Sequence, residues 1–298
     1  MNTNIFQKNV AILAKVSEEE ERIVPSNDAP LPSVEALSDI VELVKIIVFP
    51  GFFDKRQIDS NIRSYHIGVN MERLLSLLRQ QIELALLFDA HDKDETASKD
   101  SQMLAMKFID RLPEIKRLLY TDVEAIFNDD PAVRNYSEVI FCYPVVEAMI
   151  HYRVAHELLS MGIAVIPRII TEQAHAKTGI DIHPGARIGE YFSIDHGTGV
   201  VIGETCIIGN HVTLYQGVTL GAKNFKIESF GHPVDIPRHP IIEDNVTIYS
   251  NSTLLGRITI GHDTVIGGNI WITNSIPAHS KILQGKALDV SFTGGLGI

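Results

Sequence analysis

The chain has 298 residues, of which 45% are hydrophobic and 21% are charged, and its formal net charge is -11. This composition is typical of a globular protein long enough for two folding units, and the acidic balance argues against a nucleic-acid surface. The longest apolar run, residues 44–53, contains Lys45 and Pro50 and is far shorter than the ~20 residues that a membrane-spanning helix needs.

The first residues and the cysteines indicate the cellular compartment. The segment that starts at Met1 lacks a basic stretch followed by an apolar one, so no secretory signal is expected. The two cysteines, Cys142 and Cys206, fall in different predicted units, where we expect both to be buried as small hydrophobic side chains without a disulfide. These features predict a cytoplasmic protein that binds neither nucleic acid nor a membrane.

Residues 1–165 are predicted to form an α-helical domain. Their apolar positions recur three and four residues apart, as in residues 74–86, and glycine is scarce. Ser33 precedes such a segment and is expected to cap its helix. Helical sequence continues to about Ser160, with a break or kink at Pro144.

Asp130 is a polar residue in the second half of this domain. A short helix is expected to begin near Thr121, and Pro131 is expected in the first turn of the helix after it. Asp130 would then be either the cap of that helix or a side chain with a chemical role. The residues alone leave both interpretations open.

Residues 166–284 are predicted to form a parallel β-helix. An aliphatic residue returns at every sixth position, which is neither the 3.6-residue period of an α-helix nor the two-residue period of a plain strand. In a β-helix, three short strands form one triangular coil and the aliphatic residue of each hexad points into the shaft. The alternative is a β-sandwich of ordinary alternating strands. The predicted inward positions are Ile182, Ile188, Ile194, Val200, Ile202, Ile208, Leu214, Leu220, Ile242, Ile248, Leu254, Ile260, Ile266 and Ile272.

The hexads are interrupted twice, and both interruptions are candidate positions for a site. The register slips by two residues between Ile194 and Ile202. Residues 221–241 have no hexad and are expected to form a loop extruded from the shaft, either as a tolerated insertion or to carry binding groups. Asn210 and Asn269 suit corners that need an unusual backbone conformation.

Six segments together carry a resemblance to a known family. They are Asp130-Pro-Ala-Val, Tyr152-Arg-Val-Ala-His, Asp181-Ile-His-Pro-Gly-Ala-Arg-Ile-Gly, Asp195-His-Gly-Thr-Gly-Val-Val-Ile-Gly-Glu-Thr, Gln216-Gly-Val-Thr-Leu-Gly and Arg238-His-Pro. In this order they resemble the serine O-acetyltransferase family of hexapeptide-repeat acyltransferases. The resemblance covers residues 130–275, whereas the first hundred residues match the family only in being helical.

The resemblance implies a fold and a reaction. The fold class would be α+β, with an N-terminal α-helical domain followed by a C-terminal left-handed parallel β-helix. The reaction would transfer an acetyl group from acetyl-CoA to the hydroxyl of L-serine, giving O-acetyl-L-serine for cysteine biosynthesis, with no metal. The family further implies a homotrimer or a dimer of trimers, and inhibition by L-cysteine.

The chemistry of acyl transfer to an alcohol needs a general base, a group that orients it and a group that stabilises the oxyanion. His196 is the candidate base, because imidazole titrates near pH ~6.5. By resemblance, Asp181 orients His196, and His239 positions the substrate or polarises the carbonyl.

The remaining substrate contacts are also assigned by resemblance. Asp130 and Asp195 would hold the ammonium of the amino acid and Arg238 its carboxylate, which suits a zwitterion. Ala222, Ser250 and Gly268 would line the groove for CoA.

Residues 285–298 are predicted to form a flexible tail, because they are rich in glycine. The resemblance implies that Ile298 and its carboxylate dock into the active site of O-acetylserine sulfhydrylase.

Three other functions are open. A same-fold acyltransferase could use another hydroxylated acceptor such as a sugar, although a sugar needs no clamp for a zwitterion. A metal-dependent hydratase could hold zinc between subunits with three histidines, and the candidates are His183, His196, His211, His239 and His262. A scaffold could serve only to present its tail.

Overall fold

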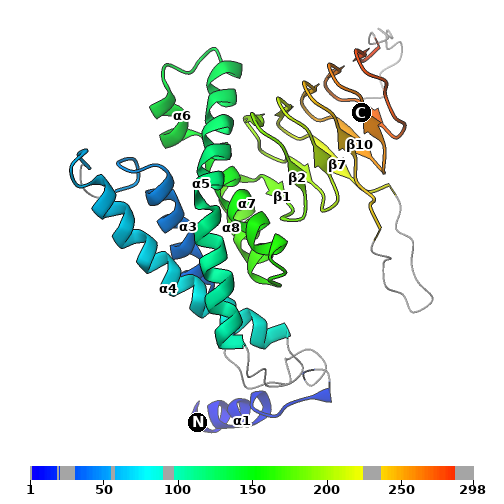
Figure 1. Ribbon diagram of the computed structural model, residues 1–298. Coiled ribbons are helices and arrows are strands. Elements are labelled where there is room, and N and C mark those ends of the chain that lie inside the picture. The colour runs from blue at the N-terminus through cyan, green and yellow to red at the C-terminus, as the bar shows by residue number, and fades with distance from the viewer. Residues whose placement is uncertain are drawn as a thin grey trace.

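The computed structural model describes residues 2–18, 20, 31–54, 58–89, 97–223 and 236–285. Helices come first and a stack of triangular coils follows them (Figure 1). The helices are α1 Asn2–Leu13, α3 Val34–Val48, α4 Arg63–Asp89, α5 Ala97–Asp129, α6 Tyr136–Cys142, α7 Pro144–Ser160 and α8 Ile166–Thr178. None of the helices in the described ranges is long and apolar enough to span a membrane.

The predicted helix ends are partly confirmed. Ser33 caps α3, and its hydroxyl oxygen accepts the Ala36 N–H at 3.2 Å. Pro144 starts α7 after a break, as expected. The short helix predicted near Thr121 is wrong: α5 runs without interruption through this position, because its buried stripe continues at Leu119 and Val123.

The boundary between the two parts lies later than expected. Residues 166–178, which the predicted domain boundary placed in the β-helix, form α8 and pack mainly against α7. Gly179 ends α8 in the left-handed conformation at φ 72°, and the first strand begins at Asp181. The hexad pattern itself starts only at Ile182, so residues 166–180 carried no repeat that supported the earlier boundary.

Three parallel sheets form the faces of the prism. Sheet A has the order β1-β4-β7-β10-β13, sheet B has β2-β5-β8-β11 and sheet C has β3-β6-β9-β12-β14. The strands are β1 Asp181–Ile182, β2 Arg187–Ile188, β3 Ser193–Asp195, β4 Val201–Ile202, β5 Ile207–Ile208, β6 Thr213–Tyr215, β7 Thr219–Gly221, β8 Ile241–Ile242, β9 Thr247–Ile248, β10 Thr253–Leu255, β11 Thr259–Ile260, β12 Val265–Ile266, β13 Trp271–Ile272 and β14 Lys281–Ile282.

The inward positions stack one above another along the shaft. Ile182 pairs in register with Ile202, and Ile202 pairs with Leu220 in the next coil. Every predicted inward residue is buried, with at most 8% of its surface exposed. Burial of one aliphatic column per face is the main stabilisation of a β-helix, since these columns and the backbone ladders join each coil to the next. The hexad prediction is therefore confirmed.

The corners of the prism need left-handed backbone. Where sheet C passes to sheet A, every coil has a residue with positive φ: His196 at 59°, Gly217 at 71°, Asn251 at 59° and Asn269 at 57°. The prediction for Asn269 is confirmed. At the sheet B to sheet C corner the left-handed residue is His211, not its neighbour Asn210.

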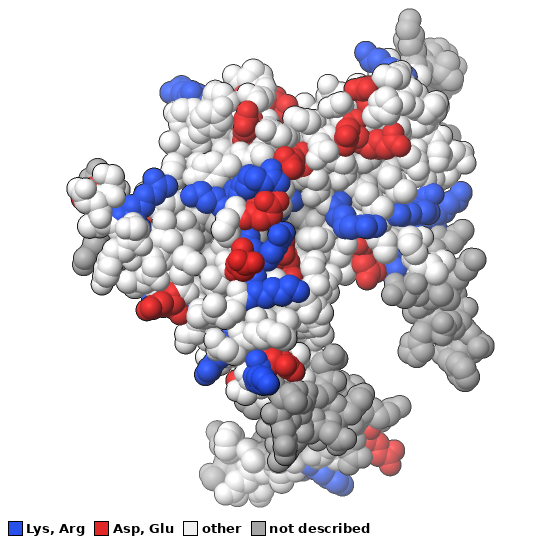
Figure 2. All heavy atoms as spheres, in the orientation of Figure 1, with Lys and Arg blue, Asp and Glu red and all other residues white. Residues whose placement is uncertain are grey.

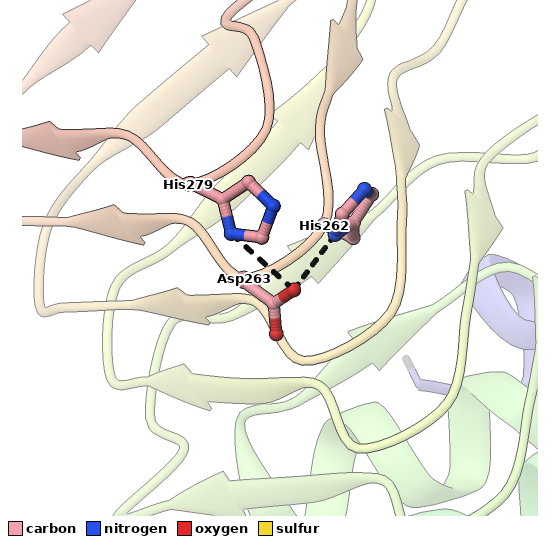
Figure 3. Close-up of side chains that lie close together, drawn as sticks. All are labelled: His262, Asp263 and His279. Carbon is pink, nitrogen blue, oxygen red and sulfur yellow. Dashed lines mark hydrogen bonds and ion pairs between the residues drawn. The ribbon is translucent and has the colours of Figure 1, made fainter.

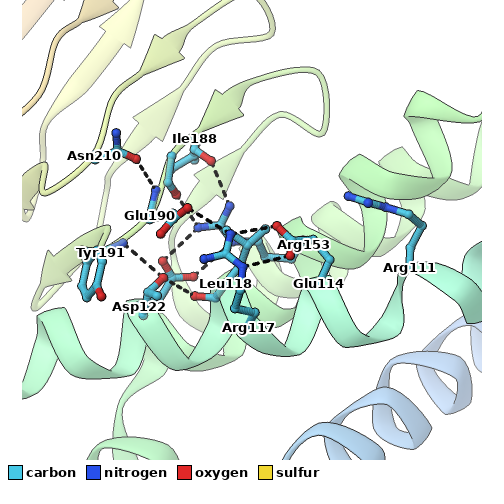
Figure 4. A network of polar contacts seen from close by, with 12 residues as sticks. Arg111, Glu114, Arg117, Leu118, Asp122, Arg153, Ile188, Glu190, Tyr191 and Asn210 are labelled. Carbon is cyan, nitrogen blue, oxygen red and sulfur yellow. Dashed lines mark hydrogen bonds and ion pairs between the residues drawn. The ribbon is translucent and has the colours of Figure 1, made fainter.

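A buried ion pair joins the helices to the first coil (Figure 4). Arg153 of α7 donates to both carboxylate oxygens of Asp122 of α5, at 2.9 and 3.1 Å. Its other N–H groups donate to the backbone oxygens of Ile188 and Gly189 at 2.9 and 2.7 Å. The Tyr152 hydroxyl also donates to the first coil, and together these bonds fix the β-helix against α5 and α7.

The cysteines and the surface charges were only partly anticipated. Cys206 is buried and both cysteines are free, as expected, but Cys142 is exposed. It lies at the end of α6, which turns Val139 and Ile140 inward and leaves Cys142 outside. Figure 2 shows basic side chains beside acidic ones across the helical part. Arg111 and Glu157 form one ion pair of this part, with 2.9 Å between Nη2 and Oε1.

Candidate functional site

Four polar side chains gather where sheet C passes to sheet A in the first coil. We call Asp130, Tyr143, Asp195 and His196 the first cluster. The two-residue slip of the hexads falls at this corner, where Gly197 and Gly199 also have positive φ, so the backbone bulges outward. As a result the His196 side chain is 72% exposed, and its Nδ1 lies 3.8 Å from Asp195 Oδ1. An exposed imidazole beside a carboxylate is available to a substrate hydroxyl.

Asp130 is held by a turn and by a tyrosine. Its Oδ1 accepts the Ala132 N–H at 2.8 Å, and its Oδ2 accepts the Tyr143 hydroxyl at 2.5 Å. These two hydrogen bonds, with a smaller contribution from His196, lower the pKa of Asp130. Asp130 does not cap a helix, because α6 begins later and is capped by Asn135. The helix-cap interpretation is therefore wrong, and the carboxylate faces the His196 corner.

Tyr143 was not assigned a role from the sequence. The hydrogen bond to Asp130, followed by burial, raises the pKa of Tyr143 to about 12, so its hydroxyl remains a donor at neutral pH. Tyr143 stands just before Pro144 and has the extended backbone that a following proline favours, with φ -85° and ψ 121°. No local motif links residues 130 and 143, and only the fold of α6 and α7 brings them together.

Asp181 borders the same corner but does not contact His196. Its nearest charged partner is Arg168 of α8, with 3.8 Å between Oδ1 and Nη1. Within the described ranges, no hydrogen bond or ion pair joins Asp181 to His196, whose carboxylate neighbour is Asp195. The pairing inferred by resemblance is thus absent from this arrangement of the chain.

A second group of polar residues lies at the other edge of sheet A, where it passes to sheet B. We call Glu204, Thr205, Arg238 and His239 the second cluster. The Thr205 hydroxyl oxygen accepts the backbone N–H groups of both Arg238 and His239, at 2.9 and 3.1 Å. These bonds anchor the end of the extruded segment on the coil below it. Residues 224–235 of that segment lie outside the described residues.

His239 is buried with one ring nitrogen committed to the protein. Its Nδ1 accepts the Thr205 backbone N–H at 3.1 Å, so the ring proton resides on Nε2. Burial, followed by the charge of Arg238, lowers the pKa of His239 to about 4. The ring is therefore a neutral donor at pH 7. A Cβ on Gly203 would lie 2.0 Å from Cδ2 of this ring, so only glycine allows the ring to pack here.

Arg238 has one N–H donor for which the described residues provide no acceptor. Its Nη2 binds Glu204 Oε2 at 2.5 Å, while its buried Nε has no hydrogen-bond partner among the described residues. A buried N–H without a partner is unfavourable unless a ligand accepts from it. Glu204 and Thr205 belong to a motif quoted above, but neither was given a role.

The two clusters lie at opposite edges of sheet A within a single chain. His196 precedes β4 and Glu204 follows it, so a strand of sheet A separates them. At about 3.3 Å per residue, residues 200–203 alone hold the clusters on the order of 10 Å apart. The ammonium and carboxylate of an amino acid are attached to one carbon. The predicted clamp of Asp130, Asp195 and Arg238 is therefore split between two edges of the prism.

The residues assigned to CoA divide in the same way. Ser250 and Gly268 are neighbours in successive coils at the sheet C to sheet A corner, and a Cβ on Gly268 would lie 3.1 Å from the Ser250 carbonyl oxygen. Ala222 lies at the other edge of sheet A, directly after β7. Ile298 lies outside the described residues.

Within the described part of a single chain, the five histidines considered as zinc ligands do not gather into one group of three. In the described part of the chain, the His, Cys, Asp and Glu groups close enough to share a cation are His262 with Asp263 and His279, and Glu172 with His175 and Asp181. Neither group contains more than one of the five.

Comparison with known proteins gives related sequences, although no family model matches the chain. A serine acetyltransferase of Synechococcus elongatus is 46% identical over 276 residues, which cover 90% of this chain and 86% of the relative. A serine acetyltransferase of Bacillus licheniformis is 43% identical over 167 residues, covering 56% of this chain and 74% of the relative.

Solved structures share the fold. Serine acetyltransferase 1 of Entamoeba histolytica in complex with L-cysteine has a TM-score of 0.72 and 34% identity, covering 89% of this chain and 94% of that one. Serine acetyltransferase isoform 3 of the same organism in complex with cysteine has a TM-score of 0.69, also at 34% identity, covering 86% and 84%.

Proposed function

The chain belongs to the serine acetyltransferase family, and on that premise we propose that it acetylates L-serine from acetyl-CoA in a site shared by two copies of the chain. The observation that supports sharing is the separation of the first cluster from the second by sheet A. β-Helical prisms associate side by side, and one edge of a prism can then face the other edge of its neighbour. A homotrimer, or a dimer of trimers, would create such interfaces.

In the proposed reaction, His196 acts as general base. Its imidazole removes the proton from the serine hydroxyl while the serine oxygen attacks the thioester carbonyl carbon. The carbon–sulfur bond of the tetrahedral adduct then breaks, and the imidazolium returns the proton to the departing thiolate of CoA. General-base assistance of this kind typically contributes about a hundred- to ten-thousandfold in rate.

The first cluster supplies negative charge for the ammonium of serine. Asp130 and Asp195 flank His196, and the lowered pKa of Asp130 keeps its carboxylate ionised. Asp181 remains a proposed orienting residue. To bind the His196 ring it would have to exchange its contact with Arg168, which is long at 3.8 Å.

The second cluster of the neighbouring copy would complete the site. Arg238 has an unpartnered Nε–H with which to bind the serine carboxylate. His239 is a neutral donor through Nε2, so it would stabilise the oxyanion rather than take a proton from serine. Ser250 and Gly268 of one copy and Ala222 of its neighbour would line the CoA groove.

Acetyl transfer to a panel of acceptors tests the reaction. Release of CoA is measured with L-serine, D-serine, L-homoserine and a simple sugar, for the parent chain and His196→Ala. We expect activity confined to L-serine and reduced at least about a hundredfold by the substitution. Acetylation of the sugar would favour the alternative acyltransferase, and activity indifferent to His196 would exclude it as the base.

Regulation and partners follow from the same premise. L-Cysteine, found in the two Entamoeba histolytica complexes, would occupy the serine position here and inhibit the enzyme. The tail ending at Ile298 would bind O-acetylserine sulfhydrylase, so deleting Ile298 should abolish that complex without affecting acetyl transfer. We propose a reducing cytoplasm as the location, because both cysteines are free.

A further inference from the structure

Two histidines and an aspartate converge at the sheet B to sheet C corner of the last coils (Figure 3). His262 and Asp263 follow β11, and His279 occupies the corresponding corner one coil later. Their ligand atoms all lie within 4.8 Å of one another. This corner is distinct from the two edges of sheet A that carry the first and second clusters.

Both imidazoles face one carboxylate oxygen. Asp263 Oδ2 lies 2.7 Å from His262 Nδ1 and 3.6 Å from His279 Nδ1. The rings meet edge to face with 4.7 Å between their centroids. All three side chains are 43% to 71% exposed, so an ion could reach them from solvent.

Neighbouring bonds hold the three residues in place. Asn245 Nδ2 donates to Asp263 Oδ1 at 3.1 Å, which leaves Oδ2 turned toward the histidines. The His279 backbone N–H donates to the His262 carbonyl at 2.9 Å, and the His262 N–H donates to Glu243 Oε2 at 2.9 Å. Contacts of this kind orient ligand side chains before a cation arrives.

We propose that His262, Asp263 and His279 bind one divalent transition-metal ion, with Zn²⁺ the best match. Two imidazole nitrogens and one carboxylate oxygen are a common zinc ligand set, with bonds of about 2.0–2.2 Å and a fourth position left for water. Ligand atoms around a tetrahedral zinc then lie about 3.4 Å apart. The 3.6 Å pair already fits this spacing, and the 2.7 Å pair needs to open by less than about 1 Å.

Such an ion would cross-link two successive coils near the end of the prism. It would connect the corner that follows β11 to the corner that precedes β14. β11 belongs to sheet B and β14 to sheet C. Because the ion would bind the folded chain and not the unfolded one, it would stabilise this end of the β-helix. The acetyl transfer proposed above needs no metal, so this site is independent of it.

Zinc binding by the full-length chain, without an affinity tag and stripped of metal by a chelator, tests the proposal. The variants are His279→Asn and Asp263→Asn. Asparagine tolerates the left-handed conformation of these positions, as Asn245 and Asn251 do, so the backbone is retained while a ligand is removed. His211→Asn is the matched control, because His211 is a left-handed residue at the same corner but stacks on Tyr191, away from the proposed ligands.

We expect one Zn²⁺ per chain in the parent and in His211→Asn, with affinity at least about tenfold weaker in the other two variants. Zn²⁺ should raise the melting temperature of the parent and the control but not of the variants, and Co²⁺ should give the visible absorption of a low-coordinate site. The absence of binding in the parent would overturn the proposal. Binding that is unchanged in both His279→Asn and Asp263→Asn would also overturn it, since the ion would then lie elsewhere.

Discussion

His239 and Tyr143 show how surroundings set the chemistry of a side chain. The pKa of His239 is lowered to about 4 by burial and by Arg238, so a histidine that could be a base is a neutral donor instead. The Tyr143 hydroxyl keeps its proton because it donates a hydrogen bond to the Asp130 carboxylate. The same hydrogen bond keeps Asp130 ionised. Among the described residues, by contrast, no hydrogen bond occupies the ring nitrogens of the solvent-exposed His196, so this side chain suits proton transfer.

Removal of the Tyr143 hydroxyl tests its bond to Asp130. A hydrogen bond to a charged group contributes about 1.5–3 kcal/mol, so Tyr143→Phe should raise KM for L-serine at least about tenfold. The KM for acetyl-CoA should stay unchanged, because Asp130 is proposed to touch only the amino acid. Steady-state kinetics with each substrate varied in turn measures both values.

Tyr120→Phe is the matched control for this experiment. The Tyr120 hydroxyl lies 3.5 Å from the Val48 carbonyl oxygen and contributes nothing to the first cluster. An unchanged KM for L-serine in Tyr143→Phe, or an equal loss for both substrates, would contradict a positioning role for Tyr143.

At the scale of elements, hydrogen bonds made by α5 and α7 join the helices to the prism. α5 and α7 hold the first coil with the Arg153–Asp122 pair, in which both side chains are at most 5% exposed. A buried ion pair is weak support for stability when compared with apolar residues, yet loss of one partner leaves a charge without compensation. The first coil also carries His196, so this junction connects stability to the site.

Arg153→Met should therefore lower the free energy of unfolding by about 3–5 kcal/mol. The double variant Arg153→Met with Asp122→Leu should recover part of this loss, since no buried charge remains. Urea denaturation at one fixed protein concentration measures both variants. Arg111→Met on α5 is the control, and the loss of its partly exposed pair with Glu157 should cost less than about 1 kcal/mol. Equal losses for Arg153 and Arg111 would refute the buried-pair argument.

At the scale of the whole molecule, the proposed division of the site between two edges of sheet A would make association a condition of activity. Each interface between prisms would combine the first cluster of one copy with the second cluster of another. A chain with a damaged first cluster still offers its second cluster to a neighbour. Two inactive variants could then restore each other.

Mixing His196→Ala with Arg238→Ala should restore activity. In randomly assembled oligomers, about a quarter of the interfaces combine an intact first cluster with an intact second one, so about a quarter of parental activity should return. The measurement is CoA release after co-expression or joint refolding. A mixture of His196→Ala with Asp195→Ala is the control and should stay inactive, because both changes damage the first cluster. Failure of the first mixture, with mixed oligomers verified by mass, would show that each chain carries a complete site.

The sequence by itself determined the prism, and it supplied most of the residues for which a chemical role is proposed. A six-residue period identifies the side chains that enter the shaft, because each coil packs on the adjacent coil, its neighbour in sequence, through the same positions. All the aliphatic positions from Ile182 to Ile272 predicted on this basis are buried. The resemblance carried by contiguous motifs added the family, which the comparisons confirm.

Only the tertiary structure decided how those residues combine. Asp130 meets Tyr143 because two helices turn between them, and Arg238 is separated from Asp195 because a strand of sheet A lies between their corners. The start of the β-helix after α8 and the convergence of His262 with His279 are also outcomes of packing. Such contacts join residues that are distant along the chain and share no period, so local patterns cannot encode them. Packing of helices and coils determines them instead.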